Sequence, residues 1–173
     1  ANSRGGEPLM DYVISRQGPS VVLGRHLDAE SMPRAAPYSL MTKCNRAGIT
    51  RIVVGHTPHG NCPTVIKTRD GDKHLEVVMN DTSFSNMKAA DNRGAAVSEF
   101  ILFPSCGARI AGVLDDGAPY DYTLGEDGGP PEELVGRLEA RLVARSKKNG
   151  EARLRFVKAK MKAGDYLLCH VNG

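Results

Sequence analysis

The chain has 173 residues, of which 23 are Lys or Arg and 20 are Asp or Glu, so its formal net charge is +3, and 40% of its residues are hydrophobic. This is the composition of an ordinary globular domain, and it excludes a collagen, a low-complexity chain and a highly charged tail. No uninterrupted apolar run of about 18 residues occurs, and no apolar stretch follows the N-terminal charges. We therefore expect neither a membrane span nor an intact signal peptide.

The four cysteines are far apart in the sequence, and none belongs to a C-x-x-C pair, which argues against a zinc ribbon or a dithiol redox motif. Scattered cysteines fit a reducing compartment better than secretion, so we expect an intracellular, cytoplasmic protein. Basic residues gather at 145–148 and 158–162. Such runs usually form a solvated face, and the absence of aromatic residues among these charges argues against nucleic-acid binding. An acidic partner or a nucleic acid would bind, if at all, through this basic C-terminal segment.

The first third of the chain predicts a loop followed by a helix and a strand. Residues 8–15 are apolar and fit either a short helix or a buried strand, and residues 19–36 are predicted mostly as a loop. Residues 38–48 are predicted as a helix that ends at Gly48, a residue suited to the left-handed cap. The β-branched residues 49–54 predict a buried strand. A helix, a glycine and an apolar strand in succession are typical of an α/β unit.

Short strands at close intervals are predicted beyond residue 63. Asp70-Gly71 and Asp116-Gly117 are typical of hairpin turns. We expect strands at residues 64–68, 75–79, 95–103, 108–114 and 120–124, with an irregular polar segment at 80–93.

The C-terminal part predicts a helix and then strands. Pro130-Pro131 would open a helix over residues 130–145, in which Leu134, Leu138 and Leu142 recur at helical spacing. Residues 152–171 predict one or two strands, joined near residues 163–165.

The segment with the clearest chemical meaning is Gly55-His56-Thr57-Pro58-His59. The apolar strand delivers His56 into a loop at its C-terminal end, where α/β sheets place ligand-binding residues. Gly55 would let the backbone turn sharply and approach a ligand, and Pro58 stiffens the loop beyond it. His56 and His59 are three residues apart, a spacing compatible with shared metal binding but also with ordinary hydrogen-bonded or exposed loop histidines.

The run Val53-Val54-Gly55-His56-Thr57-Pro58 resembles the late metal-ligand motif of the calcineurin-like metallophosphoesterases, the superfamily of the PPP-type serine/threonine phosphatases and the diadenosine tetraphosphatases. The predicted hairpin and the segment Asn80-Asp81-Thr82, both later in the chain, also match that family. The resemblance covers roughly residues 35 to 124. It implies the C-terminal half of a two-sheet sandwich with α-β-β-α layers, rich in short mixed and antiparallel strands.

By this resemblance, His56 would bind one ion of a two-metal centre, with Mn, Fe or Zn as the divalent ions. Two such ions about 3.5–4 Å apart bind phosphate oxygens and activate a bridging water, so a phosphorylated protein or nucleotide would be the substrate. The residues expected to bind substrate or to support the metal ligand are Gly55, Thr57, His59, Asp81, Thr82 and Arg93. The guanidinium of Arg93 suits phosphate recognition, although a surface arginine is the commoner case.

The sequence departs from the family where catalysis would need it most. The motifs Gly-Asp-x-His-Gly, Gly-Asp-x-x-Asp-Arg-Gly and Gly-Asn-His-Glu, which precede the late histidine in the family, do not occur in this chain. One histidine cannot hold two metals, so the chain is expected to be catalytically incomplete alone. Because the chain starts at Ala1 and the motif lies near its beginning, we expect a cut through a larger phosphatase.

Three interpretations therefore stay open. In the first, residues 1–125 are the C-terminal part of a metallophosphoesterase domain and residues 126–173 a basic extension packed on it, completed by an N-terminal half or another chain. In the second, the chain is a non-catalytic phosphatase-like subunit that binds or supports a larger assembly. In the third, it is an unrelated α/β binding domain with a chance motif. The first also predicts that the sheet containing residues 49–54 exposes apolar surface.

Overall fold

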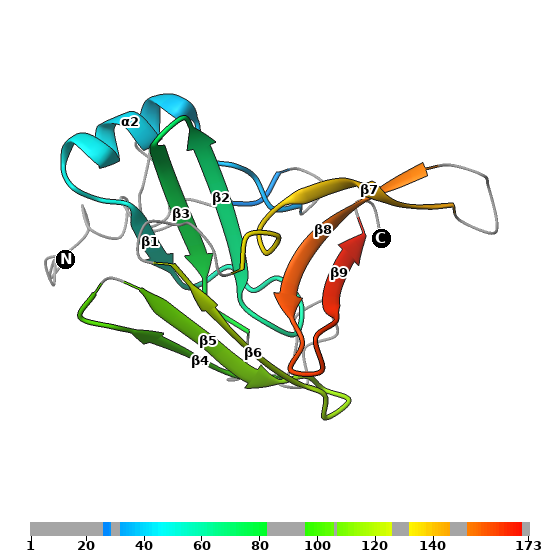
Figure 1. Ribbon diagram of the computed structural model, residues 1–173. Helices are drawn as coiled ribbons and strands as arrows, with labels where there is room; N and C mark the ends of the chain where they lie inside the picture. The colour runs from blue at the N-terminus through cyan, green and yellow to red at the C-terminus, as the bar shows by residue number, and fades with distance from the viewer. Residues whose placement is uncertain are drawn as a thin grey trace, which may run out of the picture.

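The structure is a computed structural model that describes residues 26–28, 32–82, 96–105, 107–125, 132–145 and 152–170. This part of the chain is mostly β, with one helix and nine strands in three sheets of three strands each (Figure 1). The α/β character predicted from the sequence is limited to the helix and the strand that follows it. Layers of helices on both sides of a sandwich do not occur among these residues.

The first sheet has the order β1-β3-β2, with β1 at Arg51–Val54, β2 at Thr64–Asp70 and β3 at Lys73–Met79. β1 pairs with β3 in parallel, whereas β2 and β3 form the predicted hairpin, whose turn contains Gly71 at φ 57°. Helix α2, Tyr38–Arg46, covers one end of the sheet by packing Met41 against Leu75. Its predicted end is confirmed, because Gly48 has φ 72° just beyond it.

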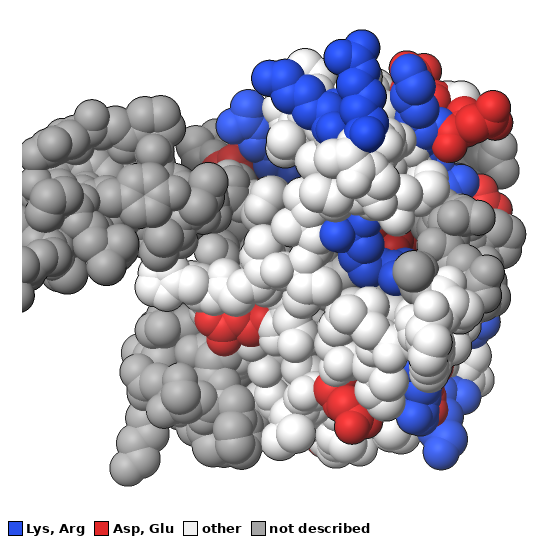
Figure 2. Space-filling view, turned by 90° about the vertical axis from the view of Figure 1, so that its left-hand side faces the viewer, with Lys and Arg blue, Asp and Glu red and all other residues white. Residues whose placement is uncertain are grey.

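β1 lies at the edge of this sheet. Ile49 and Val53 are 43% and 44% exposed, so part of the apolar surface expected here faces solvent in the isolated chain. Figure 2 views the side of the molecule on which α2 and β1 lie: Lys and Arg gather at the top of this view, and the middle is mostly uncharged.

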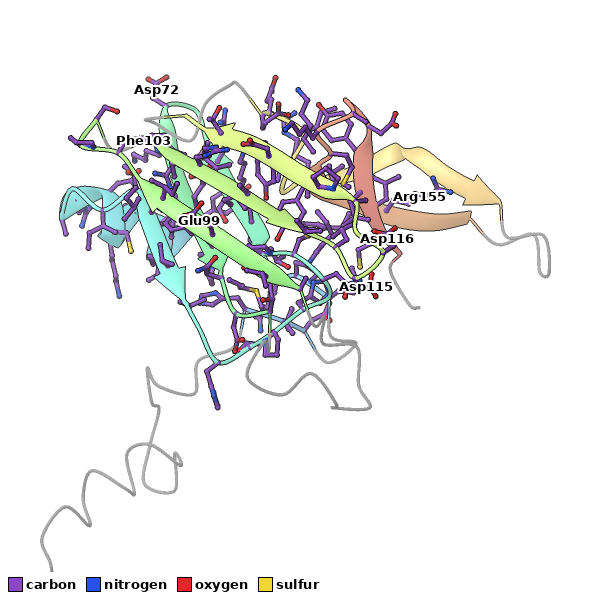
Figure 3. All side chains as sticks on the ribbon, turned by 90° about the horizontal axis from the view of Figure 1, so that it is seen from below. Asp72, Glu99, Phe103, Asp115, Asp116 and Arg155 are labelled. Atoms are coloured by element: carbon purple, nitrogen blue, oxygen red, sulfur yellow. The ribbon has the colours of Figure 1, made fainter. Side chains whose placement is uncertain are left out.

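The second sheet is an antiparallel meander of β4, Val97–Leu102, β5, Ala108–Val113, and β6, Pro119–Leu124. The predicted hairpin between β5 and β6 is confirmed, and its turn contains Asp115, Asp116 and Gly117 at φ 85° (Figure 3). Residues 8–15 and 83–93 lie outside the described residues, so the predictions there have no counterpart in the structure.

The third sheet replaces the predicted helix with a strand. β7, Leu138–Arg145, pairs with β8, Ala152–Lys160, which pairs with β9, Tyr166–His170. The helix prediction over 130–145 was therefore wrong. Residues 138–142 alternate apolar and charged types, which suits a strand. Gly136, at φ 90°, breaks any helix before it, and its backbone passes so close to β2 that an added Cβ would lie 2.9 Å from Val65 O. The leucine spacing favours a helix, but this close contact and the pairing with β8 impose a strand instead.

One hydrophobic cluster joins the three sheets. It takes residues such as Val65 and Val78 from the first sheet, Ile110 and Tyr122 from the second, and Val157 from the third. The segment beyond residue 126 thus shares its core with the rest of the described chain. This shared core brings β8 against the loop that follows β1.

Candidate functional site

The parallel pairing of β1 and β3 brings the two motif segments together. Val54 and Met79 are partners in the register, so both strands end at the same edge of the sheet, and the Asn80 amide donates a hydrogen bond to Val54 O at 2.9 Å. The residues that come after these strands are therefore neighbours: Gly55, His56 and Thr57 after β1, and Asp81 and Thr82 after β3. Carboxyl ends of parallel strands are where such sheets present ligand-binding residues.

His56 is exposed, and its backbone has φ 63°. It is the only residue other than glycine with a positive φ among the described residues. A left-handed conformation costs a non-glycine residue roughly 1–2 kcal/mol, and such costs concentrate at functional sites. The sharp turn thus falls on His56 itself, whereas Gly55 has no positive φ and open space around it.

The other predicted residues around this edge differ in exposure. Thr57 and Thr82 are buried, and the Thr82 hydroxyl donates to Ala96 O at 2.7 Å, tying the segment after β3 to the start of β4. Asp81 is half-buried. Arg93 lies outside the described residues. Sequence reasoning missed Asn80, whose buried Oδ1 has no hydrogen-bond partner within the described part of the chain.

The donor groups at this edge supply only part of a metal site. No group of three or more His, Cys, Asp or Glu residues that could hold a metal ion occurs in the described residues. The exposed imidazole of His56 could supply one ligand of a coordination sphere. A two-metal centre needs additional carboxylates and imidazoles.

A polar cluster lies where the loop after β1 turns into β2. It consists of the buried residues His59, Cys62, Thr64 and Lys158 and the half-buried Cys169. His59 is only 6% exposed, so its interpretation as a solvent-exposed loop histidine was wrong. Its Nδ1 lies 3.1 Å from Thr64 Oγ1 and 3.0 Å from Lys158 Nζ, and its Nε2 lies 3.9 Å from Cys169 Sγ. Burial, together with the charge of Lys158, lowers the pKa of His59 from 6.5 to about 4.

Lys158 comes from β8 and is 3% exposed. Its Nζ donates to Cys62 O at 3.1 Å, and also to His59 O and Thr64 Oγ1. Burial lowers its pKa. The expectation that residues 158–162 form a solvated basic face was wrong for Lys158. The one sequence feature that could have revealed it is its position in the otherwise apolar run Phe156-Val157-Lys158-Ala159.

The neighbouring thiol and imidazole raise the question of a cysteine nucleophile. Such a centre works as a thiolate beside an imidazolium. Here burial and the Lys158 charge lower the pKa of His59, and burial raises the pKa of the Cys169 thiol against the opposing effect of Lys158. Both shifts favour the neutral pair. The hydrogen bonds of the cluster suit it to holding the loop.

Comparisons with known proteins give no relative: no family model, no curated protein and no solved structure matches this chain. In the part of the chain that the structure describes, no helix has the length and apolar character needed to cross a membrane.

Proposed function

We propose that this chain is the C-terminal portion of a metal-dependent phosphoesterase, in which His56 supplies one imidazole ligand. The sheet β1-β3-β2 would form part of one of the two sheets of the complete sandwich, the one that follows later in the chain. The observation that carries the proposal is the parallel register of β1 and β3: the two strands end at the same edge of the sheet, so the exposed, left-handed His56 and the segment with Asp81 and Thr82 both follow from that edge. A metal ligand must be exposed to its ion and fixed in direction. His56 meets the first condition because it is exposed, and its left-handed backbone supports the second.

The remaining ligands would come from the N-terminal half of the fold or from another chain. Two divalent ions, Mn, Fe or Zn, would then polarise the phosphoryl group of a phosphorylated protein or nucleotide and supply the attacking water when bound. In this arrangement Thr82 would keep the segment after β3 in place through its bond to Ala96 O, and Asp81, the residue before it, would belong to the rim of the site.

The first test is the sequence that precedes Ala1 in the intact protein, where the three missing metal motifs should occur. The second is hydrolysis of p-nitrophenyl phosphate by the intact protein with Mn²⁺. We expect His56→Ala to lower kcat/KM by about a thousandfold or more, because loss of a ligand removes several kcal/mol of transition-state stabilisation. His74→Gln is the matched control, since His74 lies at the opposite end of β3, and it should stay within about twofold of the unmodified protein. Equal turnover of the two variants would remove His56 from the metal site.

A second candidate is a non-catalytic binding subunit. It is favoured by the lack of a three-ligand cluster in the described residues and by the exposed apolar residues Ile49 and Val53 at the free edge of β1. An intact protein that lacks the upstream motifs and binds no Mn²⁺, yet elutes with a second chain seated on β1, would support this candidate over the first.

A further inference from the structure

Lys158 is placed by an irregularity in the third sheet. In the pairing of β8 with β9, Val157 is opposite Leu168 and Ala159 is opposite Leu167, so the register shifts at Lys158. An extra residue in one strand bends it and redirects a side chain, and such bulges are frequent next to functional sites. Residues 156–159 are all buried in succession, unlike a strand with one solvated face. The bulge thus turns a lysine inward.

The inward lysine meets a set of acceptors that suits an ammonium group. Two backbone carbonyls, His59 O and Cys62 O, and the Thr64 hydroxyl accept hydrogen bonds from Nζ, and His59 Nδ1 lies 3.0 Å away. An ammonium has three donors and no acceptor, so these contacts use its full capacity and offset part of the cost of burying it. All four acceptors belong to residues 59–64, which we call the 59–64 turn. One side chain therefore binds this turn at three residues, through two backbone carbonyls and one hydroxyl.

The 59–64 turn is joined to His56 by a short connection. The loop is held at its start by the pairing of Val54 with Met79, and between this point and His59 only residues 55–58 intervene, including Pro58 with its fixed φ. The left-handed backbone of His56 lies in this span and needs a surrounding structure that keeps it there. The two ends of the span are held by β3 and by Lys158.

We infer that Lys158 is a positioning residue for the candidate site: by binding the 59–64 turn, its ammonium group holds the loop in the conformation that presents His56. The role given to His56 rests on the proposed function, whereas the anchoring of the turn does not. Lys158 is separated from these partners by 94 to 99 residues. A residue of the basic C-terminal segment therefore stabilises a loop that is distant in the sequence.

The test is hydrogen exchange measured by mass spectrometry on the full chain. Lys158→Met keeps the volume of the side chain and removes the donors, and Lys162→Met, at an exposed lysine of the β8–β9 turn, is the matched control. We expect exchange in residues 55–64 to rise at least about tenfold in the first variant and to stay unchanged in the second. The buried thiol of Cys62, 1% exposed, should also become reactive toward a disulfide reagent. Unchanged protection of residues 55–64 in Lys158→Met would overturn the inference.

A second variant covers a general loss of folding. Lys158→Ala leaves a space that matches propylammonium, so adding that ion should restore the protection of residues 55–64 toward the unmodified level. If β5 and β6 also exchange faster in Lys158→Met, this rescue decides: restored protection supports the anchor, and absent rescue overturns it. Activity separates the two proposals. If the loop is loosened in the Lys158 variants but the His56→Ala protein is active, the metal ligand is refuted and the anchor is kept. If the His56→Ala protein is inactive but the loop is unchanged in the Lys158 variants, the anchor alone is refuted.

Discussion

Lowering the pH from 7 to 5 should weaken the folded state through His59, because this imidazole is held neutral inside the protein. Its folded pKa is lowered from 6.5 to about 4, first by burial and then by the charge of Lys158. Between these two values the unfolded chain binds more protons than the folded chain. Stability therefore rises with pH across this window, and it is lost as the pH falls from 6.5 toward 4.

The size of the effect can be worked out from the two pKa values. At pH 5 the free histidine is almost fully protonated, whereas the buried one is protonated in roughly one molecule in ten. The resulting loss of unfolding free energy between pH 7 and pH 5 is about 2 kcal/mol. Because His59 is only 6% exposed, solvent screens little of this difference. For a chain of this size, 2 kcal/mol should move a urea midpoint by about 1 M.

Urea unfolding followed by far-UV circular dichroism at pH 7 and pH 5 measures the loss directly. His59→Gln has no titrating ring, so its midpoint should fall by about 1 M less than that of the unmodified chain. Burial also lowers the pKa of His26, which makes His26→Gln the matched control: that variant should retain the part of the pH dependence that belongs to His59. If His59→Gln loses as much stability between the two pH values as the unmodified chain, the buried neutral imidazole is refuted.

Two further substitutions test the packing around the site. Gly136→Ala should cost about 3 kcal/mol of unfolding free energy, because the backbone has φ 90° and the added Cβ would lie 2.9 Å from the β2 backbone. Gly71→Ala also meets a positive φ but lies in open space, so it should cost about 1 kcal/mol. Urea midpoints of the two variants measure the difference. Glu76→Gln should cost about 3–5 kcal/mol, because it removes the negative charge that lies 2.6 Å from the nearly buried Arg51 guanidinium. Asp121→Asn breaks a more solvent-accessible pair with Arg109 and should cost clearly less than Glu76→Gln, and equal losses in these two variants would contradict this reasoning.

Turn and helix-cap residues account for most of the correct predictions of helices and strands. The hairpin at 64–79 followed from an Asp-Gly turn between β-branched runs, and the end of α2 followed from Gly48, because glycine adopts the positive φ that such turns and helix ends need without steric cost. The segment 130–145 failed because the spacing of its leucines fits a helix, whereas Gly136 and the pairing with β8 impose a strand. Partners in a third sheet are not visible in a local window.

The site was predicted in outline only. The position of His56 after an apolar strand followed from the sequence, and so did its neighbours Asp81 and Thr82 through the family resemblance. The apolar neighbours of Lys158 hinted at its burial, but its inward direction could not be predicted, since the bulge that turns it depends on the register of two strands and not on the residue type. The unpartnered oxygen of Asn80 likewise depends on its surroundings in space.

The bond from Lys158 to the loop also sets an order of events during synthesis. Cys62 and Lys158 are 96 residues apart, and at 5–20 residues per second a ribosome needs roughly 5–20 s to add that length of chain. During this interval α2 and the β2–β3 hairpin can form from neighbouring residues, but the carbonyls of the 59–64 turn have no lysine to bind. A nascent chain that is released before β8 is complete therefore carries the histidine motif in full and still lacks the contact that fixes it.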